Sequence, residues 1–104
     1  MKAASKYFAQ PVRDLDGYFA SKKEHKHWNL LKLRERAKEI SHLERQVRFK
    51  LEVNGMPICT YVADFVYFEG QRRVVCDVKG FVTPEFKLKS KLMKAILSID
   101  VETV

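Results

Sequence analysis

The chain has 104 residues, of which 46% are hydrophobic, and its formal net charge is +7. This length predicts one domain with a single hydrophobic core, and no apolar run approaches the ~20 residues that a membrane-spanning helix needs. The positive charge favours a polyanionic partner such as nucleic acid, although a soluble domain that is merely rich in lysine would have the same composition.

Residues 1–20 are expected to form an irregular N-terminal arm, because Pro11 and the turn signal Asp16-Gly17 interrupt any regular pattern. Ser21 and Glu24 then match a capping box, in which an N-cap serine and a glutamate three residues later satisfy backbone amides. A helix is predicted to begin there. It runs to about Ile40, with an apolar stripe formed by Leu30, Leu33, Ala37 and Ile40 and widened on one side by Trp28 and Leu31.

Three strands are predicted to follow as an antiparallel meander. The first alternates apolar and polar residues from Val47 and ends at the hairpin turn signal Asn54-Gly55. The second, from about Ile58 to Phe68, is apolar on both faces and is therefore expected in the middle of a sheet. The third, from Arg73 to Lys79, follows a tight loop at Gly70-Gln71.

A second helix is predicted over residues 84–97, because Thr83 is a good N-cap and Pro84 is favoured at the first helical position. A short strand can follow near the C-terminus, so the order of elements predicts an α/β fold with a mixed or antiparallel sheet. The residues of this helix region that can pack are Leu88, Leu92, Ala95, Ile96 and Ile99. A separate basic face, which is either a solvated surface or part of a path for DNA, contains Lys87, Lys91 and Lys94.

The candidate site begins with Asp64, the only charged residue between Ile58 and Phe68. A two-residue loop at Gly70-Gln71 would place Asp64 directly opposite Asp77, where Cβ atoms are roughly 5 Å apart and like charges repel. Hard cations such as Mg²⁺ bind carboxylate oxygen, so this pair predicts a metal site.

Lys79 is predicted to share a strand face with Asp77, because side chains alternate along a strand. A divalent cation on the two carboxylates would polarise a phosphodiester and lower the pKa of a bound water. Lys79 could orient that water or stabilise the charge that develops on the phosphate. The arrangement predicts a metal-dependent phosphodiesterase, and the alternative is an exposed ion pair between Asp77 and Lys79 at the strand end.

Two further residues can reach this site. Glu24 lies on the packing side of the first helix with Trp28, so its carboxylate either only caps the helix or supplies a third oxygen to the metal. Gln46 can reach the site or DNA, although the register set by Asn54-Gly55 would put it on the opposite face of the sheet from Asp64.

Cys59 and Cys76 both lie in apolar runs, where cysteine usually acts as a small hydrophobic residue. In the predicted register Cys76 faces Phe65 and not Cys59, so no disulfide is expected. The N-terminus also lacks the apolar stretch of a signal peptide. These features predict a reducing, cytoplasmic setting.

Four blocks of sequence follow one another in the chain: Ser21-Lys22-Lys23-Glu24, Leu43-Glu44-Arg45-Gln46, Tyr61-Val62-Ala63-Asp64-Phe65-Val66-Tyr67 and Asp77-Val78-Lys79-Gly80, with Thr83-Pro84 and its lysine-rich helix after them. Together they resemble the PD-(D/E)xK nuclease superfamily and, more closely, a family of small, mostly phage-encoded proteins within it. The resemblance covers roughly residues 6–97, and Ala63 stands where the superfamily name expects proline. It implies a restriction-endonuclease-like core, helix then three-stranded antiparallel meander then helix, in a nuclease-like domain of residues 21–104.

The resemblance implies cleavage of duplex or branched DNA by a phage or prophage endonuclease in the bacterial cytoplasm, with Mg²⁺ or Mn²⁺ as cofactor. It implies that Asp64, Asp77 and the backbone carbonyl of Val78 bind the metal. The residue matching Glu24 assists, and the one matching Lys79 serves catalysis.

A chain with one active centre needs two copies to cut both strands, most simply as a C2 homodimer. The alternative function is a non-catalytic basic nucleic-acid-binding module on the same fold, in which the carboxylates have no catalytic role. Candidate DNA contacts in both cases are Lys22, Lys23, Gln46, Lys87, Lys91 and Lys94.

Overall fold

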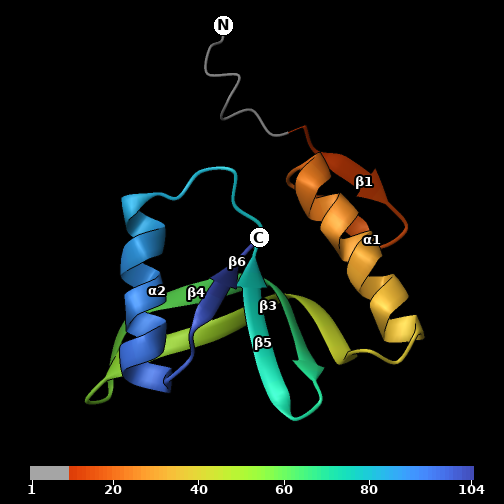
Figure 1. Cartoon of the computed structure of the whole chain (residues 1–104). Coiled ribbons are helices and arrows are strands. Elements are labelled where there is room, and N and C mark those ends of the chain that lie inside the picture. The colour runs from red at the N-terminus through yellow and green to blue at the C-terminus, as the bar shows by residue number, and fades with distance from the viewer. Residues whose placement is uncertain (1–9) are drawn as a thin grey trace, which may run out of the picture.

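A computed structural model describes residues 10–104 of the chain (Figure 1). Within these residues it contains an N-terminal hairpin, two helices and a four-stranded sheet. The elements are β1 (Val12–Asp14), β2 (Gly17–Phe19), α1 (Lys22–Arg36), β3 (Ser41–Val53), β4 (Met56–Glu69), β5 (Arg72–Asp77), α2 (Pro84–Leu97) and β6 (Val101–Thr103).

The strands of the sheet follow the order β3-β4-β5-β6. The first three form the antiparallel meander expected from the sequence, and β6 joins β5 in parallel. The predicted α/β fold with a mixed sheet is therefore confirmed. Neither helix in this part of the chain is long and apolar enough to cross a membrane.

The two helices cover opposite faces of the sheet (Figure 1). Under α2, Met93 packs in a cluster with Ala63 of β4. Under α1, Leu31 packs in a second cluster with Phe65 of the same strand. Side chains two residues apart on a strand normally share a face, so the alternation of β4 breaks at the residue between Ala63 and Phe65, which is Asp64.

Helix α1 begins at the predicted N-cap, where Ser21 Oγ accepts a hydrogen bond from the Glu24 amide at 3.0 Å. The predicted end near Ile40 is wrong, because the helix ends at Arg36. Backbone bonds of the Schellman type close it, with Lys38 in the left-handed conformation at φ +65°.

The predicted apolar stripe of α1 is also wrong. Leu30 and Leu33 are 50% and 58% exposed, whereas Leu31 is fully buried. Trp28 stacks on Phe65, with ring centroids 5.8 Å apart. The residues that the sequence assigned to the edge of the stripe therefore form the face that packs on the sheet.

Helix α2 has the predicted bounds, and Thr83 Oγ1 accepts a hydrogen bond from the Phe86 amide at 3.0 Å. Leu88 and Ala95 were expected to pack but are exposed, because Phe86 and Met93 define the buried face. The predicted basic face is exposed as expected and contains Lys87, Lys91 and Lys94.

Residues 12–19 form a hairpin where an irregular arm was expected; residues 1–9 of that predicted arm lie outside the described residues. The turn coincides with the Asp16-Gly17 signal, and Gly17 adopts φ +119°, which favours glycine. Phe19 of β2 is fully buried and lies against Trp28, with ring centroids 6.4 Å apart. The hairpin is thus packed onto α1.

The register between β4 and β5 is the one predicted, since Phe65 pairs with Cys76 across a two-residue loop. Cys59 and Cys76 are both free thiols, so the expectation that they do not form a disulfide is confirmed. Strand β5 ends at Asp77, slightly before its predicted end.

Candidate functional site

The Asp64 and Asp77 carboxylates lie where the pairing of β4 with β5 ends, just beyond the Phe65–Cys76 pair. Asp77 Oδ1 accepts a hydrogen bond from the Asp64 amide at 2.9 Å, and Asp64 Oδ2 accepts one from the Val78 amide at 2.9 Å. Each carboxylate therefore takes the place of a backbone acceptor on the neighbouring strand. The predicted proximity of the two aspartates is confirmed.

Asp77 is the most enclosed carboxylate of the site, at 2% exposed. Its second oxygen, Oδ2, is buried and has no hydrogen-bond partner among residues 10–104. Burial raises the pKa of the Asp77 carboxyl, and the hydrogen bond from the Asp64 amide and the charge of Lys79 offset part of that rise. An unpaired buried oxygen costs about 1–3 kcal/mol, so Oδ2 is a strong candidate to bind a cation or a water.

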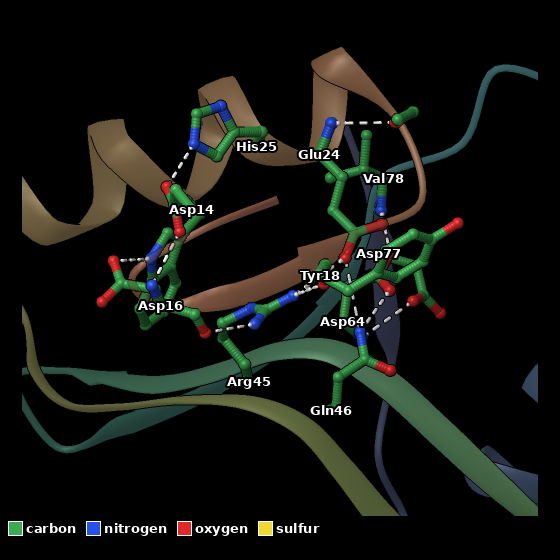
Figure 2. A network of polar contacts seen from close by, with 12 residues as sticks. Asp14, Asp16, Tyr18, Glu24, His25, Arg45, Gln46, Asp64, Asp77 and Val78 are labelled. Carbon is green, nitrogen blue, oxygen red and sulfur yellow. Dashed lines mark hydrogen bonds and ion pairs between the residues drawn. The ribbon is translucent and has the colours of Figure 1, made fainter. Parts of the chain in front are cut away.

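Glu24 projects from the first turn of α1 towards the sheet (Figure 2). Its backbone amide serves the Ser21 cap, while its buried carboxylate faces β3, with Oε2 3.7 Å from the Arg45 guanidinium. Burial raises the pKa of the Glu24 carboxyl, the charge of Asp64 raises it further, and Arg45 opposes both effects. The residue thus takes part in the helix cap through its backbone and in the site through its side chain.

Gln46 joins the two carboxylates that come from different elements. Its side-chain Nε2 donates to Glu24 Oε2 at 3.3 Å and to Asp64 Oδ1 at 3.2 Å (Figure 2). Its backbone has φ +53°, which is uncommon for a residue other than glycine. The amide therefore separates two negative charges by a pair of N–H donors.

The expectation that Gln46 lies on the opposite face from Asp64 is wrong, and a β-bulge explains the error. The Asn54-Gly55 turn pairs Glu52 with Pro57, but the next pair is Leu51 with Cys59, so one extra residue is inserted in β4. A shift of one residue moves every side chain of a strand to the other face. Gln46 consequently stands across from Asp64.

Lys79 follows the end of β5 and points towards α2. Its Nζ lies 4.5 Å from the centroid of the Phe86 ring, and its amide donates to the Val104 carbonyl at 3.1 Å. Within the described residues it is not ion-paired with Asp77, so the predicted strand-end ion pair is not formed. The positive charge of Lys79 nevertheless offsets part of the rise in the pKa of Asp77.

The predicted DNA contacts divide into two groups around this site. Lys22 and Lys23 lie at the exposed start of α1, and Lys23 Nζ donates to the Lys79 carbonyl at 3.1 Å, which ties that helix to the loop after β5. The exposed α2 lysines form the other group, and one of them, Lys94, pairs with Asp100 at 3.0 Å. Gln46 is exposed, and its side-chain amide contacts the carboxylates of Glu24 and Asp64.

Arg45 is a site residue that was not predicted from the sequence. Its guanidinium donates to the carbonyls of Asp16 at 3.1 Å and Tyr18 at 2.6 Å, and lies 3.7 Å from the centroid of the Phe19 ring. It therefore joins the N-terminal hairpin to Glu24. Recognition of residues 12–19 as a hairpin would have supplied backbone carbonyls as partners for this half-buried arginine.

The donor set fits a hard divalent cation in part. Among residues 10–104, no group of three or more His, Cys, Asp or Glu side chains has the geometry of a metal site. Mg²⁺, however, is commonly held by only one or two carboxylates together with water and substrate phosphate. In the described part of the chain Asp77 Oδ2 has no partner and Asp64 Oδ1 accepts only from the neutral Gln46 amide, so these two carboxylates suit such a cation.

No curated protein and no solved structure is significantly similar to the chain. Residues 4–99 match a family described as "Protein of unknown function (DUF1064)". This match spans most of the chain, and the protein belongs to the DUF1064 family.

Proposed function

We propose that the protein is a metal-dependent deoxyribonuclease, an endonuclease of the PD-(D/E)xK kind that hydrolyses phosphodiester bonds of duplex or branched DNA. The observation that carries this proposal is the pairing of Asp64 with Asp77 where β4 and β5 separate, with Asp77 Oδ2 buried and unpaired among residues 10–104. The order α1, β3-β4-β5, α2 also agrees with the restriction-endonuclease-like core that the sequence blocks imply.

Each residue of the site would have its own role in phosphodiester hydrolysis. Mg²⁺ or Mn²⁺ held by Asp64, Asp77 and the Val78 carbonyl would polarise the phosphodiester and lower the pKa of a bound water. Lys79 is free of carboxylate partners in the described chain and would stabilise the charge that develops on the phosphate. Glu24, linked to Asp64 through Gln46, would orient the Asp64 carboxylate.

The surface around this centre suits a polyanion. The net charge of +7 favours DNA, and exposed lysines lie on both helices that flank the end of β5. A phage or prophage enzyme would meet its DNA in the cytoplasm of a bacterial host, and a C2 dimer would supply the second centre needed for a double-strand cut. The proposed DNA contacts are Lys22, Lys23, Lys87, Lys91 and Lys94.

A cleavage assay tests the proposal directly. Linear, nicked, flapped and four-way DNA are incubated with wild type, Asp77→Asn and Lys38→Gln in Mg²⁺ or Mn²⁺. Wild type and Lys38→Gln, which loses one charge just beyond the C-terminal end of α1, should cut at least one substrate, and Asp77→Asn should cut none. Failure of wild type to cut any DNA under these conditions would remove the proposal.

One observation favours a non-catalytic nucleic-acid-binding module instead. The Asp64 and Asp77 carboxylates accept backbone amide bonds, which gives both residues a structural role at the end of the β4–β5 pairing. On that account wild type binds DNA with the salt dependence of a basic surface and cuts none. Mg²⁺ should then leave its melting temperature unchanged.

A further inference from the structure

A cavity of about 280 Å³ lies between β4 and the N-terminus of α2, on the α2 side of the carboxylate site. We call it the α2 cavity. It shares Lys79 with the proposed catalytic centre, and its other lining residues used below are Tyr61, Thr83, Glu85, Phe86 and Lys89.

Tyr61 lines this cavity and carries a polar group, its hydroxyl, that the fold does not explain. Tyr61 is 3% exposed, and its hydroxyl is buried without a hydrogen-bond partner in the described chain. The ring itself is well packed, with centroids 6.5 Å from Phe49 and 6.3 Å from Phe86. Phenylalanine would fill the same space without an unpaired polar atom. Native proteins seldom leave such a group unpaired, so the hydroxyl indicates a ligand oxygen or a water as its partner.

The surrounding charges select an anion as that ligand. Lys79 and Lys89 bring two ammonium groups to the cavity, and α2 directs the positive end of its dipole towards it. Helix N-termini are suited to phosphate because their first backbone amides point outwards. Here Thr83 Oγ1 uses the Phe86 amide and Pro84 has none, which leaves the Glu85 amide as the available donor of that turn.

Among the described residues, Glu85 is the one negative group that lines the cavity. Its carboxylate pairs with Lys89 at 3.2 Å. The Glu85 side chain is 74% exposed, whereas that of Lys89 is 28% exposed. The carboxylate can therefore move into solvent when an anion approaches, while Lys89 stays at the cavity.

We propose that the α2 cavity binds a phosphate group of a nucleic-acid strand, with Tyr61 as hydrogen-bond donor and Lys79 and Lys89 as counter-charges. Because the charge of Lys79 also acts on Asp77, the bound phosphate would neighbour the one that is cleaved, and this placement rests on the proposed nuclease function. Such a site fixes the position of the strand along its own axis without reading its sequence.

The test uses the full chain in EDTA, so that no cleavage is involved. Wild type, Tyr61→Phe, Lys89→Gln and Lys38→Gln are melted in inorganic phosphate and in chloride at equal ionic strength. Each is also titrated with a short single-stranded oligonucleotide by fluorescence anisotropy. Lys38→Gln is the matched control, because it removes one charge from a residue that lines a different cavity.

Phosphate should raise the melting temperature of wild type and of Lys38→Gln above the value in chloride. Tyr61→Phe should melt higher than wild type in chloride, since it removes a buried unpaired hydroxyl, yet gain little from phosphate. Tyr61→Phe and Lys89→Gln should each weaken oligonucleotide binding at least tenfold, the loss expected for a hydrogen bond to a charged group.

Equal responses to phosphate and chloride, or an unchanged oligonucleotide affinity of Tyr61→Phe, would overturn the phosphate site. That result is separable from the fate of the nuclease proposal. If wild type cuts DNA while the two cavity variants bind and cut as wild type does, only the phosphate site fails. If the cavity variants lose phosphate and wild type cuts no DNA, only the nuclease proposal fails.

Discussion

The side-chain amide of Gln46 lies 3.2 Å from Asp64 Oδ1 and holds that oxygen apart from Glu24 Oε2, to which the same nitrogen donates at 3.3 Å. A neutral donor thus occupies the space between two carboxylates, one from β4 and one from α1. The two acceptors depend on a residue whose own backbone is in the left-handed region. This relationship makes Gln46 the centre of the first prediction.

Gln46→Ala should lower the free energy of unfolding by about 1–3 kcal/mol in EDTA, because two partly buried carboxylate oxygens lose their shared donor. Mg²⁺ should then restore more stability to the variant than to wild type, since a cation no longer has to displace the amide. Urea unfolding with and without Mg²⁺ measures both effects. An unchanged stability in EDTA would show that the Gln46 contacts contribute nothing.

Asp77→Asn should melt at a higher temperature than wild type in EDTA, because it removes a charge that burial disfavours. Mg²⁺ at ten times its dissociation constant should stabilise wild type by about 1.4 kcal/mol, or roughly 5–10 °C, and should have almost no effect on the variant. Differential scanning calorimetry gives both values. A lower melting temperature for Asp77→Asn, together with a wild type that ignores Mg²⁺, would make the aspartate pair structural.

Replacement of Lys87 and Lys91 by glutamine should reduce the salt dependence of DNA binding. Each neutralised phosphate contributes about 0.9 to the slope of log K against log salt, so the double variant should lose up to ~2. Lys94→Gln should change the slope less, because Lys94 is already paired with Asp100. Anisotropy titrations at several salt concentrations measure the slopes, and an identical slope for the double variant would return this face to a solvated surface.

The hairpin should detach from α1 in acid. The hydrogen bond from Lys32, followed by that from Trp28, holds the pKa of Asp16 below its usual 3.8. A lowered pKa means that the contribution of Asp16 to stability is present above about 3.8 and is lost as the pH falls through the lower folded value. Trp28 Nε1 donates to Asp16 Oδ2 at 2.9 Å and is the only tryptophan, so its fluorescence should change in that range.

Asp16→Asn is the control for this titration, since the variant keeps the side-chain shape and removes the ionisation. Its Trp28 emission should be flat where the emission of wild type changes. Identical titrations of the two proteins would assign the acid transition to another group.

Local signals predicted local structure well. Ser21 and Thr83 cap the two helices as expected, because capping depends on a side chain and the backbone amide three residues ahead. The Gly70-Gln71 loop likewise determined which residue of β4 faces Asp77. The proximity of Asp64 and Asp77 could therefore be predicted from the sequence.

Features that depend on contacts between residues distant in the sequence could not be predicted. The bulge beside Ile58 moved Gln46 to the face of Asp64. Pro57 precedes that extra residue, but proline in a strand is as compatible with an edge as with a bulge, so it does not determine the register. The helical period alone could not decide which side of α1 faces the sheet, because Leu30 and Leu33 are as apolar as Leu31. Contact with Phe65 on the sheet decided it.

Removal of the N-terminal hairpin would change the contacts of Arg45. A chain shortened to residues 21–104 would lose the two carbonyls and the aromatic ring on which this guanidinium rests. Arg45, whose side chain is 14% exposed, would then keep Glu24 as its remaining ionic contact and would be free to draw that carboxylate away from Gln46. The hairpin, although far from the two aspartates in sequence, therefore belongs to the packed unit that positions Glu24.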